Sequence, residues 1–203
     1  MYVPLSNQIT DPETIDRFIE MHGFANLVTS HDGVPFASHL PVLHDQDRGV
    51  LRGHMARANE QWQHFTKETE VLCIFSGPHA YVSPRWYASE VVVPTWNDAV
   101  VHVYGFAEII EDKEVLLKIV EDTTAKCEQR FKQPWSMQLP NGTVDGLMKA
   151  IVGFSIHISR VEAKFKLGQN KSPEDQEAML LGLEADSDPA SRELANFVKQ
   201  FKP

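Results

Sequence analysis

Alternating apolar and polar positions predict β-strands over most of the middle of the chain. Phe36, Ser38, Leu40 and Val42 fall on one face of such a strand, because successive side chains point to opposite faces. Asp32-Gly33 is a tight-turn signal that predicts a hairpin. The continuous apolar run at 71–75 predicts a strand buried on both faces, interrupted at Gly77-Pro78. The expected strands are 25–29, 35–43, 50–55, 71–75, 80–83, 99–110 and one from about 154 to 166.

Apolar residues at helical spacing predict helices before, between and after these strands. Ile15, Phe18 and Ile19 form the stripe of the first helix, which Thr10-Asp11-Pro12-Glu13 begins. Ser172-Pro173 and Asp188-Pro189 predict the starts of two helices in the tail. The other expected helices are 58–65, 112–131 and 144–150, with an Asn141-Gly142 turn before the last.

The order of these elements favours a mainly β fold. Six or seven strands lie between residues 24 and 167, with helices mostly outside them, which is typical of a small antiparallel barrel with peripheral helices. Regular alternation of strands and helices around a G-x-G-x-x-G motif is missing from the sequence, so a dinucleotide-binding Rossmann fold is not expected.

Composition and charge narrow the class of protein. The 203 residues suit one main domain, and 19 basic against 28 acidic residues give a formal net charge of −9. Such a charge argues against wrapping in nucleic acid, because Lys and Arg supply that affinity. Two distant cysteines, an N-terminus unlike a signal peptide and no apolar run of membrane-spanning length indicate a cytoplasmic protein without a membrane segment.

Polar clusters interrupt the strand pattern and suggest ligand chemistry. Arg57, Arg85 and the lysines of segment 164–171 are candidate anchors for a phosphate or carboxylate. Arg57 could complete an anion site with free N–H groups of a helix beginning near Asn59; alternatively, Asn59 caps that helix and Arg57 is a surface charge. Nine histidines are present, but their spacing matches no metal-binding motif, so we predict no metal site.

The aromatic loop residues leave two interpretations open. Trp86, Tyr87 and Trp96 lie in one predicted loop region, where burial by packing is the ordinary explanation. The other interpretation is a wall for a flat ring, with Thr95 or Asn97 hydrogen-bonding its edge. The serines lack the context of a nucleophilic triad, so the catalytic residues are unknown.

The clusters together resemble one known family. The chain carries SHLP at 38–41, GHMARANEQW at 53–62, FSGPHAYVSPRWY at 75–87, VPTWN at 93–97, VHVYG at 101–105, AIVGF at 150–154 and KFKLGQN at 164–170, after Met1-Tyr2-x-Pro4. In this order the motifs resemble the PaiB family, described as FMN-binding negative transcriptional regulators with a split β-barrel. The resemblance runs from residue 1 to about residue 170.

The resemblance implies a fold like the pyridoxamine-phosphate oxidase and flavin reductase-like split barrels, which usually form homodimers with FMN at the subunit interface. It implies a split-barrel FMN-binding domain over 1–170, with C-terminal helices at 171–203 packed on the same domain. Two positions depart from the family pattern: Asp98 follows Trp96-Asn97 in place of a tyrosine, and Gly168 replaces a serine before Gln169.

The resemblance also implies which residues bind FMN. Phosphate and ribityl candidates come from the first motifs, ring candidates from the middle ones, and two residues approach from the late strand. These are, in that order, His39, His54, Arg57 and Asn59; Tyr81, Ser83, Trp86, Thr95, Trp96 and Asn97; and Lys166 and Gln169.

Two functions follow as expectations. The family implies a negative transcriptional regulator, but the acidic charge and the missing helix-turn-helix signal make direct DNA binding doubtful and favour indirect action. The alternative is an FMN-dependent oxidoreductase, or flavin reductase-like enzyme, acting on a small molecule. A pyridoxal-phosphate or haem-binding relative of the same barrel is a third hypothesis.

Overall fold

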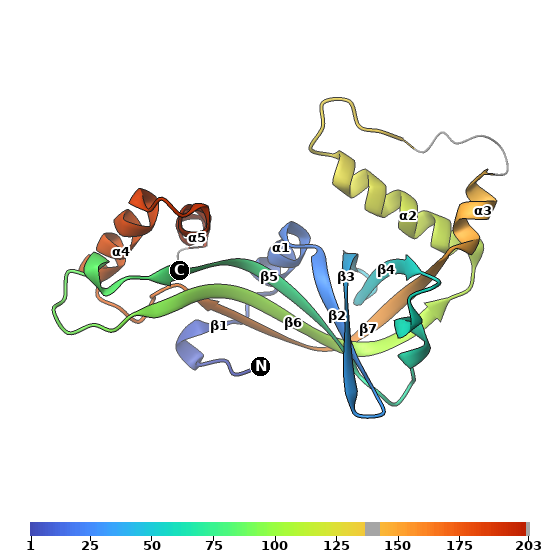
Figure 1. The fold of residues 1–203 in the computed structure, drawn as a ribbon, viewed down its shortest axis with the longest axis horizontal. Helices are drawn as coiled ribbons and strands as arrows, with labels where there is room; N and C mark the ends of the chain where they lie inside the picture. The colour runs from blue at the N-terminus through green and yellow to red at the C-terminus, as the bar shows by residue number, and fades with distance from the viewer. Residues whose placement is uncertain (137–142, 202–203) are drawn as a thin grey trace. The chain divides into compact units, whose positions relative to one another are not determined.

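The computed structural model describes residues 1–136 and 143–201, which form seven strands and five α-helices (Figure 1). The strand order is β1-β7-β4-β3-β2-β5-β6, and β7 also pairs with β6. All the pairs with a described register are antiparallel. The strands are β1 Gln8–Ile9, β2 Phe24–His31, β3 Val34–Asp45, β4 Val50–Ala56, β5 Val71–Val82, β6 Thr95–Ile110 and β7 Ile151–Lys166.

The second pairing of β7 closes six of these strands into a ring. On one edge β7 pairs with β4, from Val50 opposite His157 to Ala56 opposite Ile151. Its additional pairing with β6 joins the two sides of the sheet. The closed ring of antiparallel strands confirms the predicted barrel.

The predicted hairpin is confirmed, with longer strands than the sequence suggested. Asp32 and Gly33 have φ of 51° and 77°. Positive φ at both central residues matches the right-handed twist of the strands that a two-residue turn joins. β2 and β3 pair from Phe24 opposite Pro41 to His31 opposite Val34.

Three predictions of local structure were wrong. β5 runs through Gly77-Pro78 as one strand from Val71 to Val82, and its described pairing with β2 covers only Leu72–Ile74. One face of 71–75 is buried and the other half-buried. The helix expected at 58–65 is a 3₁₀ helix, η2 Glu60–His64. The Asn141-Gly142 turn lies outside the described residues.

The helices begin at the predicted caps. The side chain of Asp112 accepts hydrogen bonds from the backbone N–H groups of Glu114 and Val115, while Ser172 and Asp188 cap the two tail helices. In the described residues, no helix is both long enough and apolar enough to cross a membrane. The helices are α1 Pro12–Met21, α2 Lys113–Glu128, α3 Thr143–Lys149, α4 Pro173–Ala185 and α5 Pro189–Gln200; two more 3₁₀ helices are η1 Leu5–Asn7 and η3 Pro84–Trp86.

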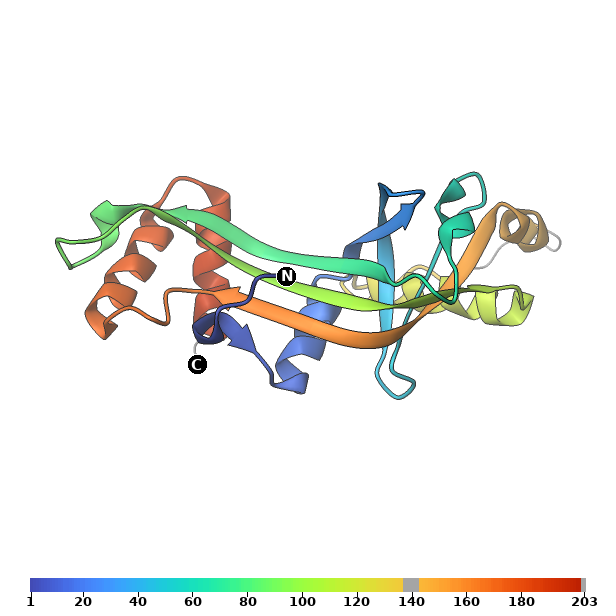
Figure 2. The same cartoon turned by 90° about the horizontal axis from the view of Figure 1, so that it is seen from below.

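The chain divides into two compact units. Unit 1 contains residues 1–18, 76–101 and 162–203, and unit 2 contains 19–75 and 102–161. The long strands β5, β6 and β7 each contribute residues to both units. The tail helices α4 and α5 belong to unit 1, where they lie side by side (Figures 1 and 2). The predicted boundary at residue 170 stays a prediction.

An aromatic cluster forms the core of unit 1. Phe165 of β7 lies 5.0 Å from Phe18 of α1 and 5.2 Å from Phe197 of α5, measured between ring centroids. Phe201 stacks on Phe197 at 4.4 Å, and the guanidinium of Arg17 lies 4.2 Å from the centre of the Phe201 ring. These contacts fix α5 on the strands through its apolar face.

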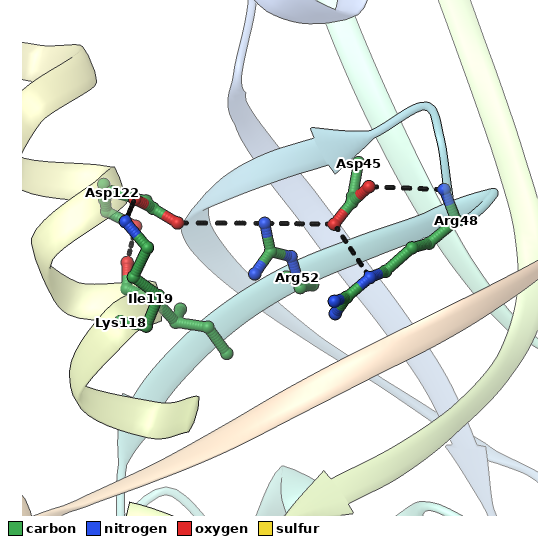
Figure 3. Close-up of polar contacts among 7 residues, drawn as sticks. Asp45, Arg48, Arg52, Lys118, Ile119 and Asp122 are labelled. Carbon is green, nitrogen blue, oxygen red and sulfur yellow. Dashed lines mark hydrogen bonds and ion pairs between the residues drawn. The ribbon is translucent and has the colours of Figure 1, made fainter. Parts of the chain in front are cut away.

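In unit 2, ion pairs fix α2 against the β3–β4 hairpin. Arg52 of β4 lies between Asp45 of β3 and Asp122 of α2 (Figure 3). Its Nη2 is 3.2 Å from Asp45 Oδ2 and 3.8 Å from Asp122 Oδ2, and Lys118 Nζ donates to Asp122 Oδ1 at 2.7 Å. The Arg52 side chain is only 17% exposed, so removing either acid would leave a poorly solvated charge.

The closure between β6 and β7 depends on one glycine. A Cβ on Gly105 of β6 would collide with the backbone carbonyl of His157 on β7. Backbone atoms cannot move aside as a flexible side chain can, so any larger residue separates the two strands.

We therefore expect Gly105→Ala to lower the free energy of unfolding by about 1–3 kcal/mol, as overpacking generally does. The matched control is Gly146→Ala, because Gly146 lies in α3 with open space around it. The control should be neutral or stabilising, since alanine favours a helix. Urea unfolding measures both variants, and equal stability of the two would contradict the role of Gly105.

Candidate functional site

The twelve predicted site residues fall into two sets. Four of them lie in unit 2 and eight in unit 1. The unit 2 set is His39 on β3, His54 on β4, and Arg57 and Asn59 between β4 and η2. The unit 1 set is Tyr81 on β5, Ser83 and Trp86 at η3, Thr95, Trp96 and Asn97 on β6, and Lys166 and Gln169 at the end of β7.

Asn59 caps the short helix η2. Its Oδ1 accepts a hydrogen bond from the N–H of Gln61 at 3.1 Å, and its Nδ2 donates to Ser38 Oγ at 2.8 Å. Asn59 is therefore the cap of the short helix, as one of the two interpretations expected. The N–H of Gln61 is bonded to Asn59, so it is not free to bind an anion.

Arg57 is exposed but makes two specific bonds. Its Nε donates to the carbonyl of Lys149 and its Nη2 to that of Ile151, both at 3.0 Å. The backbone N–H of Arg57 also donates to Ala150 at 2.8 Å. Arg57 is thus more than a surface charge, because it ties the end of β4 to the junction between α3 and β7.

Arg57 also borders a cavity of unit 2 that measures about 700 Å³. Lys113 and Lys149 line it together with Asp145, Trp62 and the apolar side chain of Met148. Lys113 pairs with Asp145, so part of the positive charge is neutralised. This size lies within the range of sites for small organic ligands.

The two histidines of unit 2 differ in their surroundings. His39 is exposed on β3. His54 is half-buried, and its Nδ1 is buried without a hydrogen-bond partner among the described residues. Burial lowers the pKa of His54, so its ring is neutral at neutral pH and can donate or accept one hydrogen bond from a ligand.

The aromatic residues of unit 1 divide between a surface and a core. Tyr81 and Trp96 are 45% and 58% exposed, on neighbouring strands, and their ring centroids are 6.2 Å apart. Trp86 packs so closely on Gly182 of α4 that a Cβ there would collide with its ring. Tyr87 is buried. The packing interpretation therefore holds for Trp86 and Tyr87, whereas Tyr81 and Trp96 present a free aromatic surface.

Three residues of the unit 1 set meet at one small cavity. Thr95, Asn97 and Lys166 line a cavity of about 170 Å³, and the ammonium of Lys166 donates to Thr95 Oγ1. Asn97 is 1% exposed, with its Nδ2 3.3 Å from the sulfur of Met179, a weak acceptor. Tyr87 and Lys171, which the sequence analysis considered as a ring wall and as an anion anchor but did not include among the FMN-binding residues, line the same cavity, as does Asn7, which the sequence analysis missed.

Two other predicted residues serve local structure. Ser83 caps η3, where its Oγ accepts from the N–H of Arg85 at 3.3 Å. Gln169 clamps the turn after β7, because its Oε1 accepts from Leu167 N at 2.8 Å while its Nε2 donates to Phe165 O.

The two departures from the family pattern have physical explanations. Asp98 forms an ion pair with Lys164 at 2.7 Å, so its charge is neutralised within unit 1. Gly168 has φ of 84°, a conformation that a serine adopts only with strain. Glycine thus suits the turn that Gln169 clamps.

No cluster of three or more His, Cys, Asp or Glu side chains that could hold a metal ion occurs among residues 1–136 and 143–201.

Replacing Arg57 by glutamine should lower the free energy of unfolding by about 1–2 kcal/mol, since hydrogen bonds from charged groups to two carbonyls are lost. Arg85→Gln is the control, because Arg85 is exposed and its side chain makes no described contact. Urea unfolding decides: a variant as stable as the wild type would show that the tie contributes nothing.

The stability of the FMN-free protein should depend on pH through His54. Because the folded pKa lies below the ordinary value of 6.5, the unfolded chain binds the proton first as the pH falls. The free energy of unfolding should therefore decrease below about pH 6.5 and stop decreasing, as far as His54 contributes, below its folded pKa. His54→Asn should lose less stability than the wild type between pH 8 and 5.5; parallel losses would contradict this.

Comparison with known proteins supports one family. Residues 1–160 match the family described as "Putative FMN-binding domain". The chain is 34% identical over 203 residues to "Protease synthase and sporulation protein PAI 2" of Bacillus subtilis, covering 98% of this chain and 97% of that protein. It is 32% identical over 200 residues to an uncharacterized protein of Emericella nidulans, covering 82% and 80%.

Solved structures share the fold at low identity. The flavocytochrome Anf3 of Azotobacter vinelandii matches with a TM-score of 0.61 and 17% identity, over 84% of this chain and 74% of that chain. The FAD and heme binding protein of Mycobacterium smegmatis matches with a TM-score of 0.62 and 12% identity, over 85% and 79%. These likenesses support the split-barrel fold. The chain therefore belongs to the PaiB family of FMN-binding proteins, and FMN is its cofactor.

Proposed function

We propose that this chain is a cytoplasmic, homodimeric FMN-binding protein that lowers gene expression indirectly rather than by binding an operator. The relative in Bacillus subtilis is named for protease synthesis and sporulation, which suggests a role in controlling other proteins. The observation that carries the indirect mechanism is the packing of α5.

α5 is the last helix and carries both positive and negative side chains. Its buried residues include Leu194, Ala195, Phe197 and Val198, and Phe197 lies in the aromatic core of unit 1. A recognition helix presents base-reading side chains to the major groove, usually within a basic protein. A packed helix in a chain of net charge −9 suits neither condition.

The described residues fit FMN. The buried, unpartnered Nδ1 of His54 would bond a ribityl hydroxyl, and His39 and Arg57 would assist with the phosphate. The exposed rings of Tyr81 and Trp96 would stack on a flat ring system. In this proposal Asn59, Ser83 and Gln169 act as supporting groups, since each caps or clamps the backbone.

When bound, FMN supplies hydride or electron transfer. The residues of this chain contribute binding and orientation. A neutral His54 offers a hydrogen bond without adding charge, and Lys166 supplies a positive charge in unit 1.

The homodimer is supported by an exposed apolar hairpin. Phe24 of β2 and Val34 and Phe36 of β3 are 69%, 65% and 42% exposed. The described pairing of β3 with β4 covers only residues 42–45, so most of β3 has a strand partner on one side alone. Covering this surface with a second copy would remove an exposed sheet edge.

An FMN-dependent oxidoreductase is the second candidate. The cavity of about 700 Å³ in unit 2 favours it, because that cavity could hold a small organic substrate.

Purified protein given FMN and freed of excess should retain a flavin absorption spectrum with a stoichiometry near one FMN per chain. Trp96→Ala should weaken FMN binding about two- to tenfold, since loss of a stacked ring costs roughly 0.5–1.5 kcal/mol. Trp135→Ala, which removes an indole that is 53% exposed in unit 2, is the control. A folded protein that retains no flavin would overturn the binding proposal.

The same sample separates the two functions. Fluorescence anisotropy with duplex DNA from upstream of the chain's own coding region should show no binding between 50 and 200 mM salt. Specific binding that weakens steeply with salt would contradict indirect action. Consumption of NADH or NADPH by the FMN-loaded protein would favour the oxidoreductase.

A further inference from the structure

The small cavity of unit 1 has an unusual balance of charge. Two lysines, Lys166 and Lys171, line its wall, together with the amides of Asn7, Asn97 and Asn170. None of the residues that line it is Asp or Glu, although the whole chain carries nine more acidic than basic residues. The cavity therefore offers cations and neutral donors without a competing carboxylate.

Among the described residues, neither lysine forms a direct ion pair with a carboxylate, although the charge of Lys171 is felt by Asp175 of α4. The ammonium of Lys166 donates to a neutral hydroxyl, Oγ1 of Thr95. The Nζ of Lys171 lies 5.1 Å from the centre of the Tyr87 ring. By contrast, Lys164, two residues earlier on β7, pairs with Asp98 at 2.7 Å. The chain thus pairs the neighbouring lysine directly with a carboxylate, whereas Lys166 has a neutral hydrogen-bond partner and Lys171 is attracted by Asp175 without forming an ion pair.

Asp175 does not line the cavity, but its charge acts on two residues that do, Tyr87 and Lys171. Asp175 of α4 accepts hydrogen bonds from the N–H and the hydroxyl of Ser89, at 2.9 and 2.8 Å. These bonds lower the pKa of Asp175, so the group is ionised but already satisfied. Burial, with Asp175 nearby, raises the pKa of Tyr87, which keeps that phenol a hydrogen-bond donor.

The wall that carries the two lysines is held in place before any ligand arrives. The turn after β7 is clamped by Gln169, and the N–H of Lys171 donates to the carbonyl of Gly168 at 2.9 Å. A preformed turn reduces the ordering cost of binding.

We propose that this cavity binds a phosphate group. Its volume of about 170 Å³ equals roughly five or six water molecules at about 30 Å³ each, which suits a tetrahedral oxyanion rather than a three-ring flavin. A phosphate monoester carries about −1.5 to −2 charges at pH 7, which two lysines balance. The proposal rests on unit 1 alone and does not require the proposed function to be correct.

Isothermal titration of the FMN-free protein with inorganic phosphate tests the site directly, in a phosphate-free buffer. The double variant Lys166→Gln/Lys171→Gln should bind phosphate at least tenfold more weakly than the wild type. The charge-matched control is Lys67→Gln/Lys132→Gln, two exposed lysines of unit 2, which should bind as the wild type does. Lys166→Arg, which keeps the charge, should retain most of the affinity and guards against a folding defect.

Absence of phosphate binding by the wild type, or an equal loss in the control, would overturn the proposal.

Titrations with FMN and riboflavin identify which ligand supplies the phosphate group. If the double variant weakens FMN binding but not riboflavin binding, the cavity holds the phosphate of FMN. If phosphate binding falls while FMN binding is unchanged, the site serves a second, phosphorylated ligand. Retained flavin without phosphate binding would refute this inference and leave the proposed function intact.

Discussion

The pairing of β7 with both β4 and β6 is the constraint on which the rest of the fold depends. It closes the sheet, and it requires two backbones to approach at Gly105 with no room for a side chain. Once the ring is closed, β5, β6 and β7 continue into unit 1 as long strands. They provide rigid positions for Tyr81, Trp96 and Lys166, and a site built on strands is held more precisely than one built on loops.

The recognised motifs combine ligand chemistry with local support. Asn59, Ser83 and Gln169 use their side chains to cap or clamp the backbone. Thr95 and Lys166 instead face a cavity. A motif residue can therefore be essential because it positions a neighbour, and its type alone does not reveal which role it has.

Net charge describes this chain poorly at the scale of a site. The acidic total of −9 coexists with a cavity whose lining contains two lysines and neither Asp nor Glu. Pairs such as Lys164–Asp98 and the Arg52 network neutralise other cations locally. What a small ligand meets is therefore set by the pairing of charges over a few ångströms, where solvent screens least.

The sequence by itself determined the features that depend on neighbouring residues. The Asp32-Gly33 hairpin and the caps at Ser172 and Asp188 follow from local turn and capping rules. The family motifs likewise indicated the barrel and FMN. These signals are short-range, so they can be seen without knowing the fold.

Only the tertiary structure decided the features that join distant segments. β5 continues through Gly77-Pro78, where the sequence predicts a break, and Arg57 bonds to carbonyls more than ninety residues away. The phosphate cavity likewise brings Asn7 together with Lys166 and Lys171. Such contacts depend on which strands pair. The free energy of strand pairing comes from many residues that are distant in the sequence, so no local pattern reveals it.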